Sequence, residues 1–174
     1  MGKLPPGHYS KLSGMDSLAF LHGAFHWIVV STLSNYSVVS FSISNEVYGE
    51  ILLSERIHNI FKIASVESGF SVLGGLLCAY CTYRMEGTFK LWVMKNYGVK
   101  KSWTGLFTIQ ETHLHKVIPK YMFADGEVLL LFHDEYENCG FWTSKGPFEL
   151  WPRSPSFQQG FIFTESLISP KLLI

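Results

Sequence analysis

The chain has 174 residues, of which 47% are hydrophobic and 16% are aromatic. This composition provides a buried core, but the length is too short for two ordinary domains, so we expect one domain or part of one. Lys plus Arg and Asp plus Glu both number 14. Because there is no excess charge to attract nucleic acid or an anionic membrane surface, we expect the partner to be a protein or a small molecule.

The start of the chain and its cysteines indicate the cellular compartment. Residues 1–15 lack the apolar core of a secretory signal and are expected to form an N-terminal tail. The apolar run at residues 24–30 is much shorter than the roughly 18 residues that a membrane span needs. Three cysteines, an odd number, suit a reducing environment. We therefore expect a cytoplasmic or nuclear protein without membrane attachment.

A glycine recurs at nearly constant spacing along the chain. Gly23, Gly75 and Gly126 lie 52 and 51 residues apart, close to the roughly 40 to 50 residues of one propeller blade. Each follows one residue of a short link between two apolar runs, which predicts a hairpin with a two-residue type I′ turn. The predicted strand pairs are 18–21 with 24–30, 70–73 with 76–80, and 121–124 with 128–132.

Two further strands complete each repeat. An aromatic residue, Phe41, Trp92 or Trp142, marks the third strand at a similar distance from its glycine, and the fourth strands are predicted at 46–53, 102–109 and 147–151. Four-stranded antiparallel meanders in series predict an all-β fold, a partial kelch-like β-propeller of about three blades. Its repeat units are about 17–53, 69–109 and 117–151. Residues 55–64 form a connector with one turn of helix at most.

Several phrases of the sequence resemble the F-box-associated domain of plant ubiquitin-ligase receptors, including pollen proteins of self-incompatibility loci. They run in that family's order from Asp16 to Leu172, and the domain is expected to span 16–172 as the C-terminal part of the family's region. The phrases are GAFHWI, VVSFSISNEVYGEILL, FKLWVMKNYGVKKSWTGLFTI, DGEVLLLF and TESLISPKL.

The resemblance implies a substrate receptor of an SCF-type ubiquitin ligase, in which this region selects the protein that is ubiquitinated. An F-box, which would contact the Skp-type adaptor and the cullin, is not encoded in MGKLPPGHYSKLSG. We therefore expect this chain alone not to bind that adaptor. A shortened interaction or decoy protein without ligase coupling is one alternative, and a propeller lectin is another.

The links between the second and third strands, at 31–37, 81–88 and 133–140, are expected to gather at one edge of the stacked meanders. Tyrosine there offers rigid amphipathic contacts, and charged side chains offer selectivity. Ordinary solvated loops of polar composition are the alternative interpretation. The candidate partner-binding residues are Tyr36, Tyr83, Arg84, Glu86, Asp134, Glu135 and Tyr136.

Other chemistry in the sequence is sparse, and we expect neither an enzyme, nor a cofactor, nor a bound metal. None of the common hydrolase, protease or nucleotide-binding motifs occurs. Cys78 and Cys81 have redox spacing, but in a strand they would point to opposite faces. Glu111, His113 and His115 could offer zinc ligands, although a fourth ligand is lacking in the sequence nearby. Trp92 and Trp103 are expected to pack between blades.

Overall fold

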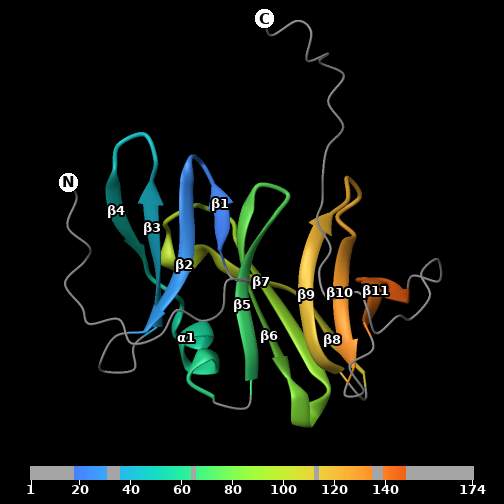
Figure 1. Cartoon of the computed structure of the whole chain (residues 1–174). Coiled ribbons are helices and arrows are strands. Elements are labelled where there is room, and N and C mark those ends of the chain that lie inside the picture. Colours follow the sequence, from blue (N-terminus) through green and yellow to red (C-terminus); the bar gives the residue numbers. More distant parts are fainter. Residues whose placement is uncertain (1–17, 31–35, 64–65, 112–113, 135–138, 148–174) are drawn as a thin grey trace, which may run out of the picture.

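The structure is a computed structural model that describes residues 18–30, 36–63, 66–111, 114–134 and 139–147. These residues form three four-stranded antiparallel sheets, each a meander in which consecutive strands are neighbours (Figure 1). The predicted all-β fold and the three four-stranded meanders are confirmed. Each sheet is open, and the described strands do not close into a ring.

The elements follow one another in the same order in each sheet. A single α-helix, α1 (Glu55–Phe61), links the first two sheets within the described part of the chain, and short 3₁₀ helices η2 (Arg84–Glu86) and η3 (Lys100–Ser102) lie in links of the second. The strands are β1 (Ala19–Leu21), β2 (Ala24–Val30), β3 (Tyr36–Ser42), β4 (Val47–Ile51), β5 (Val66–Leu73), β6 (Leu76–Tyr83), β7 (Thr88–Met94), β8 (Trp103–Gln110), β9 (Leu114–Met122), β10 (Val128–Asp134), β11 (Cys139–Thr143) and β12 (Gly146–Pro147).

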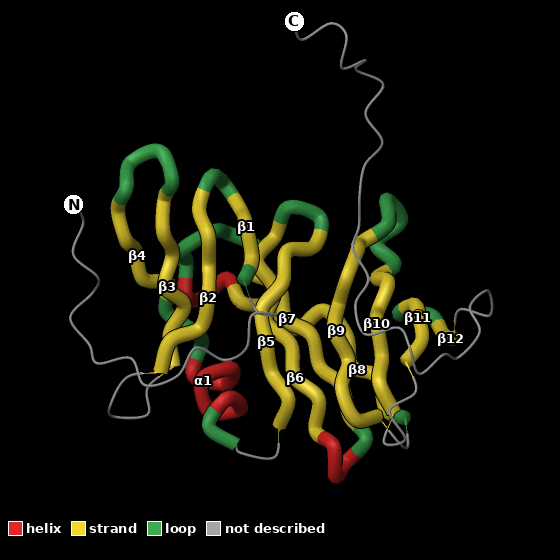
Figure 2. The backbone as a smooth tube through the Cα atoms, viewed as in Figure 1, coloured by secondary structure: helices red, strands yellow, loops and turns green. Residues whose placement is uncertain are grey.

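The three repeat glycines occupy hairpin turns at the same edge of the sheets (Figure 2). Their φ angles are 74°, 76° and 83°, values that glycine adopts without a Cβ clash. Two-residue turns at Gly23 and Gly75 are confirmed, because the residue before each glycine also has positive φ. The two-residue turn predicted at Gly126 is wrong. There the Gly126 N–H donates to the Phe123 carbonyl, and Gly126 ends a three-residue loop with glycine at its left-handed position.

Several predicted boundaries are also wrong. Strand β9 begins at Leu114, seven residues before the predicted strand, and α1 is a seven-residue helix rather than a single turn. Phe41 does not share the position of Trp92 and Trp142. Trp92 pairs with Ala79 and Trp142 pairs with Leu130, and both partners lie four residues after their repeat glycine. In the first sheet, the residue four positions after Gly23 pairs with Val39 of β3, so Val39 occupies the equivalent position.

Two hydrophobic clusters hold the three sheets together, and the second sheet belongs to both. One face of β6, with Leu77, Ala79 and Cys81, packs with Ile28 and Val38 of the first sheet. Trp92 and Trp103, 5% and 9% exposed, lie in this cluster. The opposite face of the second sheet packs against the third through a second cluster that includes Cys78, Tyr80, Leu91, Leu130 and Phe132.

A polar contact also joins the first two sheets at the edge of the glycine turns. The His26 ring is fully buried, and its Nε2 shares a 2.6 Å hydrogen bond with the hydroxyl of Tyr97 from the β7–β8 link. Burial lowers the pKa of His26, which favours the neutral ring. His22 contacts the same tyrosine ring edge-on at 5.0 Å. His22 and His26 therefore both contact Tyr97.

Candidate functional site

The predicted partner-binding residues that the structure describes lie at the edge opposite the glycine turns, where α1 and η2 are found (Figure 2). Tyr36 begins β3, Tyr83 ends β6, Asp134 ends β10, and Arg84 and Glu86 form the ends of η2. Glu135 and Tyr136 lie outside the described residues. We call this the lower edge; its described portions include α1 and the β6–β7 link with η2.

Tyr36 is held by helix α1 instead of projecting freely from a loop. Its ring centroid lies 6.1 Å from that of Phe61, and its carbonyl oxygen lies 3.2 Å from Nδ1 of His58. The side chain is half-buried against the first hydrophobic cluster. Tyr36 therefore fixes the helix on the sheet and exposes only part of its surface to a partner.

Tyr83 is half-buried on the same cluster and keeps its proton over the whole physiological range. Burial is the main reason that its pKa is raised to about 12, and the nearby Cys81 and Glu86 raise it further. Lys90 Nζ lies 4.8 Å from the centre of the Tyr83 ring, a cation–π geometry. Tyr83 is thus a neutral hydrogen-bond donor beside a cation.

Arg84 is already neutralised within the chain. It forms an ion pair with Glu67 of β5, and both side chains are about 40% exposed. Such an exposed pair stabilises the fold little, but it reduces the charge that Arg84 offers to a partner. Met85, at the tip of the same link, is 91% exposed and presents an adaptable apolar side chain.

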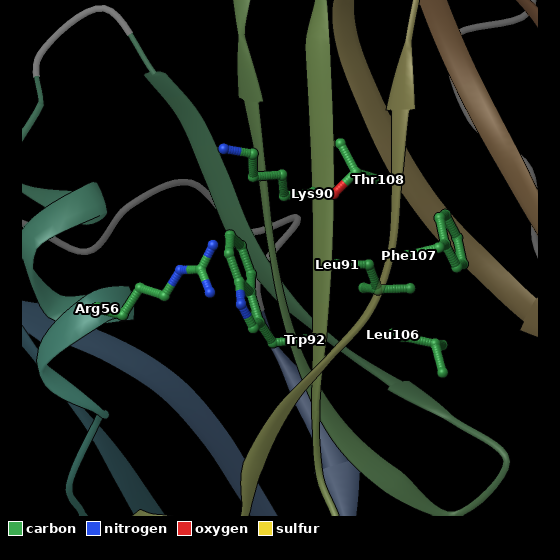
Figure 3. Close-up of a pocket in the computed structure, with 8 residues that line it drawn as sticks. Arg56, Lys90, Leu91, Trp92, Leu106, Phe107 and Thr108 are labelled. Atoms are coloured by element: carbon green, nitrogen blue, oxygen red, sulfur yellow. The ribbon is translucent and has the colours of Figure 1, made fainter.

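A cavity of about 230 Å³ lies beside this edge, between α1 and strands β7 and β8 (Figure 3). Strand register explains its composition: Lys90 pairs with Thr108, and Trp92 pairs with Gly105, so these residues belong to one face of the sheet. Arg56 of α1 points toward the Trp92 indole over that face (Figure 3). The remaining lining residues are Leu91, Leu106 and Phe107.

Local backbone structure keeps the cavity open. A bulge interrupts the β7–β8 pairing between Leu91 and Trp92 and leaves Leu106 without an opposite residue. On the helix side, the Ser54 Oγ accepts a hydrogen bond from the Ile57 N–H and caps α1. Buried Ile57 and its neighbours on the same helix face fix the rotation of α1 and hence the position of Arg56.

A second hollow lies by the β9–β10 hairpin, and its charges are satisfied. Asp125 and Glu127 line it, and the Lys145 ammonium donates to both at 2.8 and 3.2 Å. The hydrogen bond from Lys145 is the main reason that the pKa of Asp125 lies below its ordinary value. Since the carboxylates already have a cation, this hollow offers no free charge for binding or proton transfer.

The geometry of the described residues supports neither a redox site nor a metal site. Cys78 and Cys81 belong to different hydrophobic clusters, and burial raises the pKa of each thiol to about 12. Among described side chains, no group of three His, Cys, Asp or Glu residues lies close enough to hold a metal ion. His113, one of the candidate zinc ligands, lies outside the described residues.

Sequence reasoning missed Arg56, Lys90 and Gly105. Arg56 was hidden because residues 55–64 were predicted to be a connector, and its neighbours in the cavity are at least 34 positions away in the sequence. The alternation of Lys90 and Trp92 on a strand was the available signal, because residues two apart share a face. Only the position of α1 brings the second cation to that face.

No known family profile matches the chain. The chain is similar to a curated plant protein, F-box protein CPR1 of Arabidopsis thaliana, with 28% identity over 91 residues. The matched region is 51% of this chain and 21% of the relative, so it spans about a fifth of the relative's length. No helix in the described part of the chain has the length and apolarity needed to cross a membrane.

Proposed function

We propose that this chain is the non-enzymatic, protein-binding region of an F-box-type receptor of a ubiquitin ligase. In this proposal it is an F-box-associated domain, and its three sheets are consecutive blades of a propeller-like array. The similarity to F-box protein CPR1 carries the proposal. The Skp-type adaptor and cullin would be contacted by the F-box of such a receptor, in the cytoplasm or nucleus, while this region binds the protein to be ubiquitinated.

The chemistry of the lower edge supports protein binding. Tyrosine, methionine and arginine are enriched in protein interfaces, and Tyr83, Arg84 and Met85 follow one another there. The neighbouring helix adds Arg56, and Tyr36 is packed against that helix. An edge of this kind supplies a few anchoring side chains, which commonly carry most of the binding free energy of an interface.

The test compares proteins captured from a plant extract by the unmodified chain and by two double variants. Tyr83→Ala with Arg84→Ala changes the lower edge, and Lys100→Ala with Lys101→Ala removes two charges at the opposite edge as a control. We expect the first variant to capture at least tenfold less of a specific protein than the unmodified chain does, whereas the control variant captures it normally. Circular dichroism confirms that each variant is folded.

Two further measurements test whether a captured protein is ubiquitinated through the receptor. A captured protein should accumulate in ubiquitinated form when the proteasome is inhibited, and should accumulate less when the lower-edge variant replaces the unmodified sequence in the full-length receptor. Equal capture by all three proteins would contradict binding at this edge. Binding to a glycan array without any captured protein would favour the lectin alternative.

A further inference from the structure

The cavity between α1 and β7–β8 presents hydrogen-bond donors and cations, and none of its described lining residues is a carboxylate. Arg56 and Lys90 provide two positive charges, Trp92 provides an indole N–H, and Thr108 provides a hydroxyl. Two positive charges without a described carboxylate beside them are complementary to an anion.

The two cations, Arg56 and Lys90, have no carboxylate partner in the part of the chain that the structure describes. Arg84, by contrast, forms an ion pair with Glu67. Arg56 lowers the pKa of Tyr83 and Glu86 raises it, so both charges lie near the Tyr83 hydroxyl. The cationic cavity therefore adjoins the predicted binding residues.

The indole N–H of Trp92 is a hydrogen-bond donor at this cavity. The described residues supply no acceptor for it, and they contain no fully buried side-chain nitrogen or oxygen without a partner. The Trp92 Nε1 atom therefore retains access to solvent although the residue is only 5% exposed. A Cβ at Gly105 would lie 3.8 Å from Cδ1 and Nε1 of Trp92, so the absence of a side chain there leaves this edge of the indole uncovered.

From these observations we infer that the cavity binds the carboxylate of an Asp or Glu side chain of a partner protein. A guanidinium and an indole N–H can donate to the two oxygens of one carboxylate, and Lys90 adds a second positive charge. The volume of about 230 Å³ is smaller than the roughly 300–1,000 Å³ of typical small-molecule pockets and suits a single side chain. This inference rests on the proposed function and names the chemistry of the bound protein segment.

The direct test uses two synthetic peptides, acetyl-hexaglutamate amide and acetyl-hexaglutamine amide, titrated into the complete chain by calorimetry. We expect the glutamate peptide to bind at least tenfold more tightly, and its affinity to fall as NaCl is raised. Inorganic phosphate and free glutamate are titrated separately to measure binding of a simple anion. Equal affinity for the two peptides, or binding of phosphate as tight as binding of the glutamate peptide, would overturn the inference.

Three variants locate the binding. Arg56→Gln removes a cation, and Gly105→Leu fills the cavity at a position whose φ is not in the left-handed region. Each should lower the affinity for the glutamate peptide by at least fivefold without changing the circular dichroism spectrum. Lys101→Gln removes the same charge at the opposite edge and should have no effect beyond twofold. Unchanged binding by both cavity variants would place the peptide elsewhere and refute the assignment.

The same variants separate this inference from the proposed function. If a protein captured from extract is lost by the Tyr83→Ala, Arg84→Ala variant but retained by Arg56→Gln and Gly105→Leu, the carboxylate assignment is wrong and the proposed function stands. If the glutamate peptide binds in the cavity but no protein is captured, the cavity is correct and the proposed function is wrong.

Discussion

Cys78 and Cys81 show how strand alternation determines the environment of individual side chains. They are three positions apart on β6, so one packs toward the third sheet and the other toward the first. The sequence predicted this divergence correctly. Burial on both faces raises the pKa of each thiol to about 12, further above neutral pH than the ordinary 9.0.

The raised thiol pKa values predict a loss of stability in alkali. Because each folded thiol has a pKa of about 12, above the ordinary 9.0, the folded state holds its protons more tightly than the unfolded state does. The resulting stabilisation is complete below pH 9 and is lost between pH 9 and 12, by up to about 1.4 kcal/mol per pH unit for each thiol.

Urea unfolding at pH 8, 9, 10 and 10.5 measures this effect. Tyr83 contributes with the same sign because its folded pKa is also raised to about 12, so the measurement is made in a Tyr83→Phe background. Replacing both Cys78 and Cys81 by alanine should flatten the pH dependence, although it also lowers stability at every pH. A free energy of unfolding that stays constant from pH 8 to 10.5 before this replacement would contradict the prediction.

At the scale of the elements, turn chemistry was predicted better than strand length. Strand β2 has the predicted limits because a glycine turn fixes its start and its apolar run is continuous. Strand β9 was missed for most of its length because His115, Lys116 and Lys120 interrupt the apolar pattern, yet it pairs with β10 along nearly its whole length. Backbone pairing continues through polar residues at a half-exposed face, so the pattern of side chains underestimates it.

Helix α1 illustrates the opposite difficulty. Its seven residues are too few for stable helix formation alone, so the sequence favoured a connector. In the structure, packing of Ile57, Ile60 and Phe61 into the first cluster stabilises the helix. The cavity depends on this tertiary packing, which explains why the candidate edge could be predicted from the repeat but the cavity could not.

The β7–β8 link supplies a test at this scale. Ser102 Oγ accepts from the Asn96 N–H at 3.1 Å and lies 2.8 Å from the carbonyl oxygens of Asn96 and Val99. We expect Ser102→Ala to lower the free energy of unfolding by about 1 kcal/mol because these hydrogen bonds are lost. Ser44→Ala is the control, since its hydroxyl makes one 3.4 Å contact in an exposed turn. Chemical denaturation measures both, and equal effects would show that the link is not held by Ser102.

For the molecule as a whole, the shared second sheet predicts a single unfolding transition. Leu77 and Leu91 are 1% and 0% exposed and belong to the first and second clusters, respectively. Replacing either leucine by alanine should lower the free energy of unfolding by about 2–5 kcal/mol, because it removes buried methyl groups and leaves a cavity. Leu106→Ala, at an exposed position of β8, should cost less than about 0.5 kcal/mol.

Far-UV circular dichroism and tryptophan fluorescence should give the same urea midpoint for each of these variants. If Leu91→Ala separates the two signals, the third sheet unfolds independently of the other two, and the prediction of one cooperative unit is wrong.

The sheets contact one another through unlike faces. Ile28 and Tyr80 each lie five residues after their turn glycines and face the following sheet, whereas Leu77 and Leu130 face the preceding one. The array therefore has a polarity, and its first and last sheets present different surfaces. Copies that associated through these ends would join head to tail, and such contacts propagate into filaments unless they close into a ring. A substitution that makes one end complementary to the other should consequently produce fibres in preference to dimers.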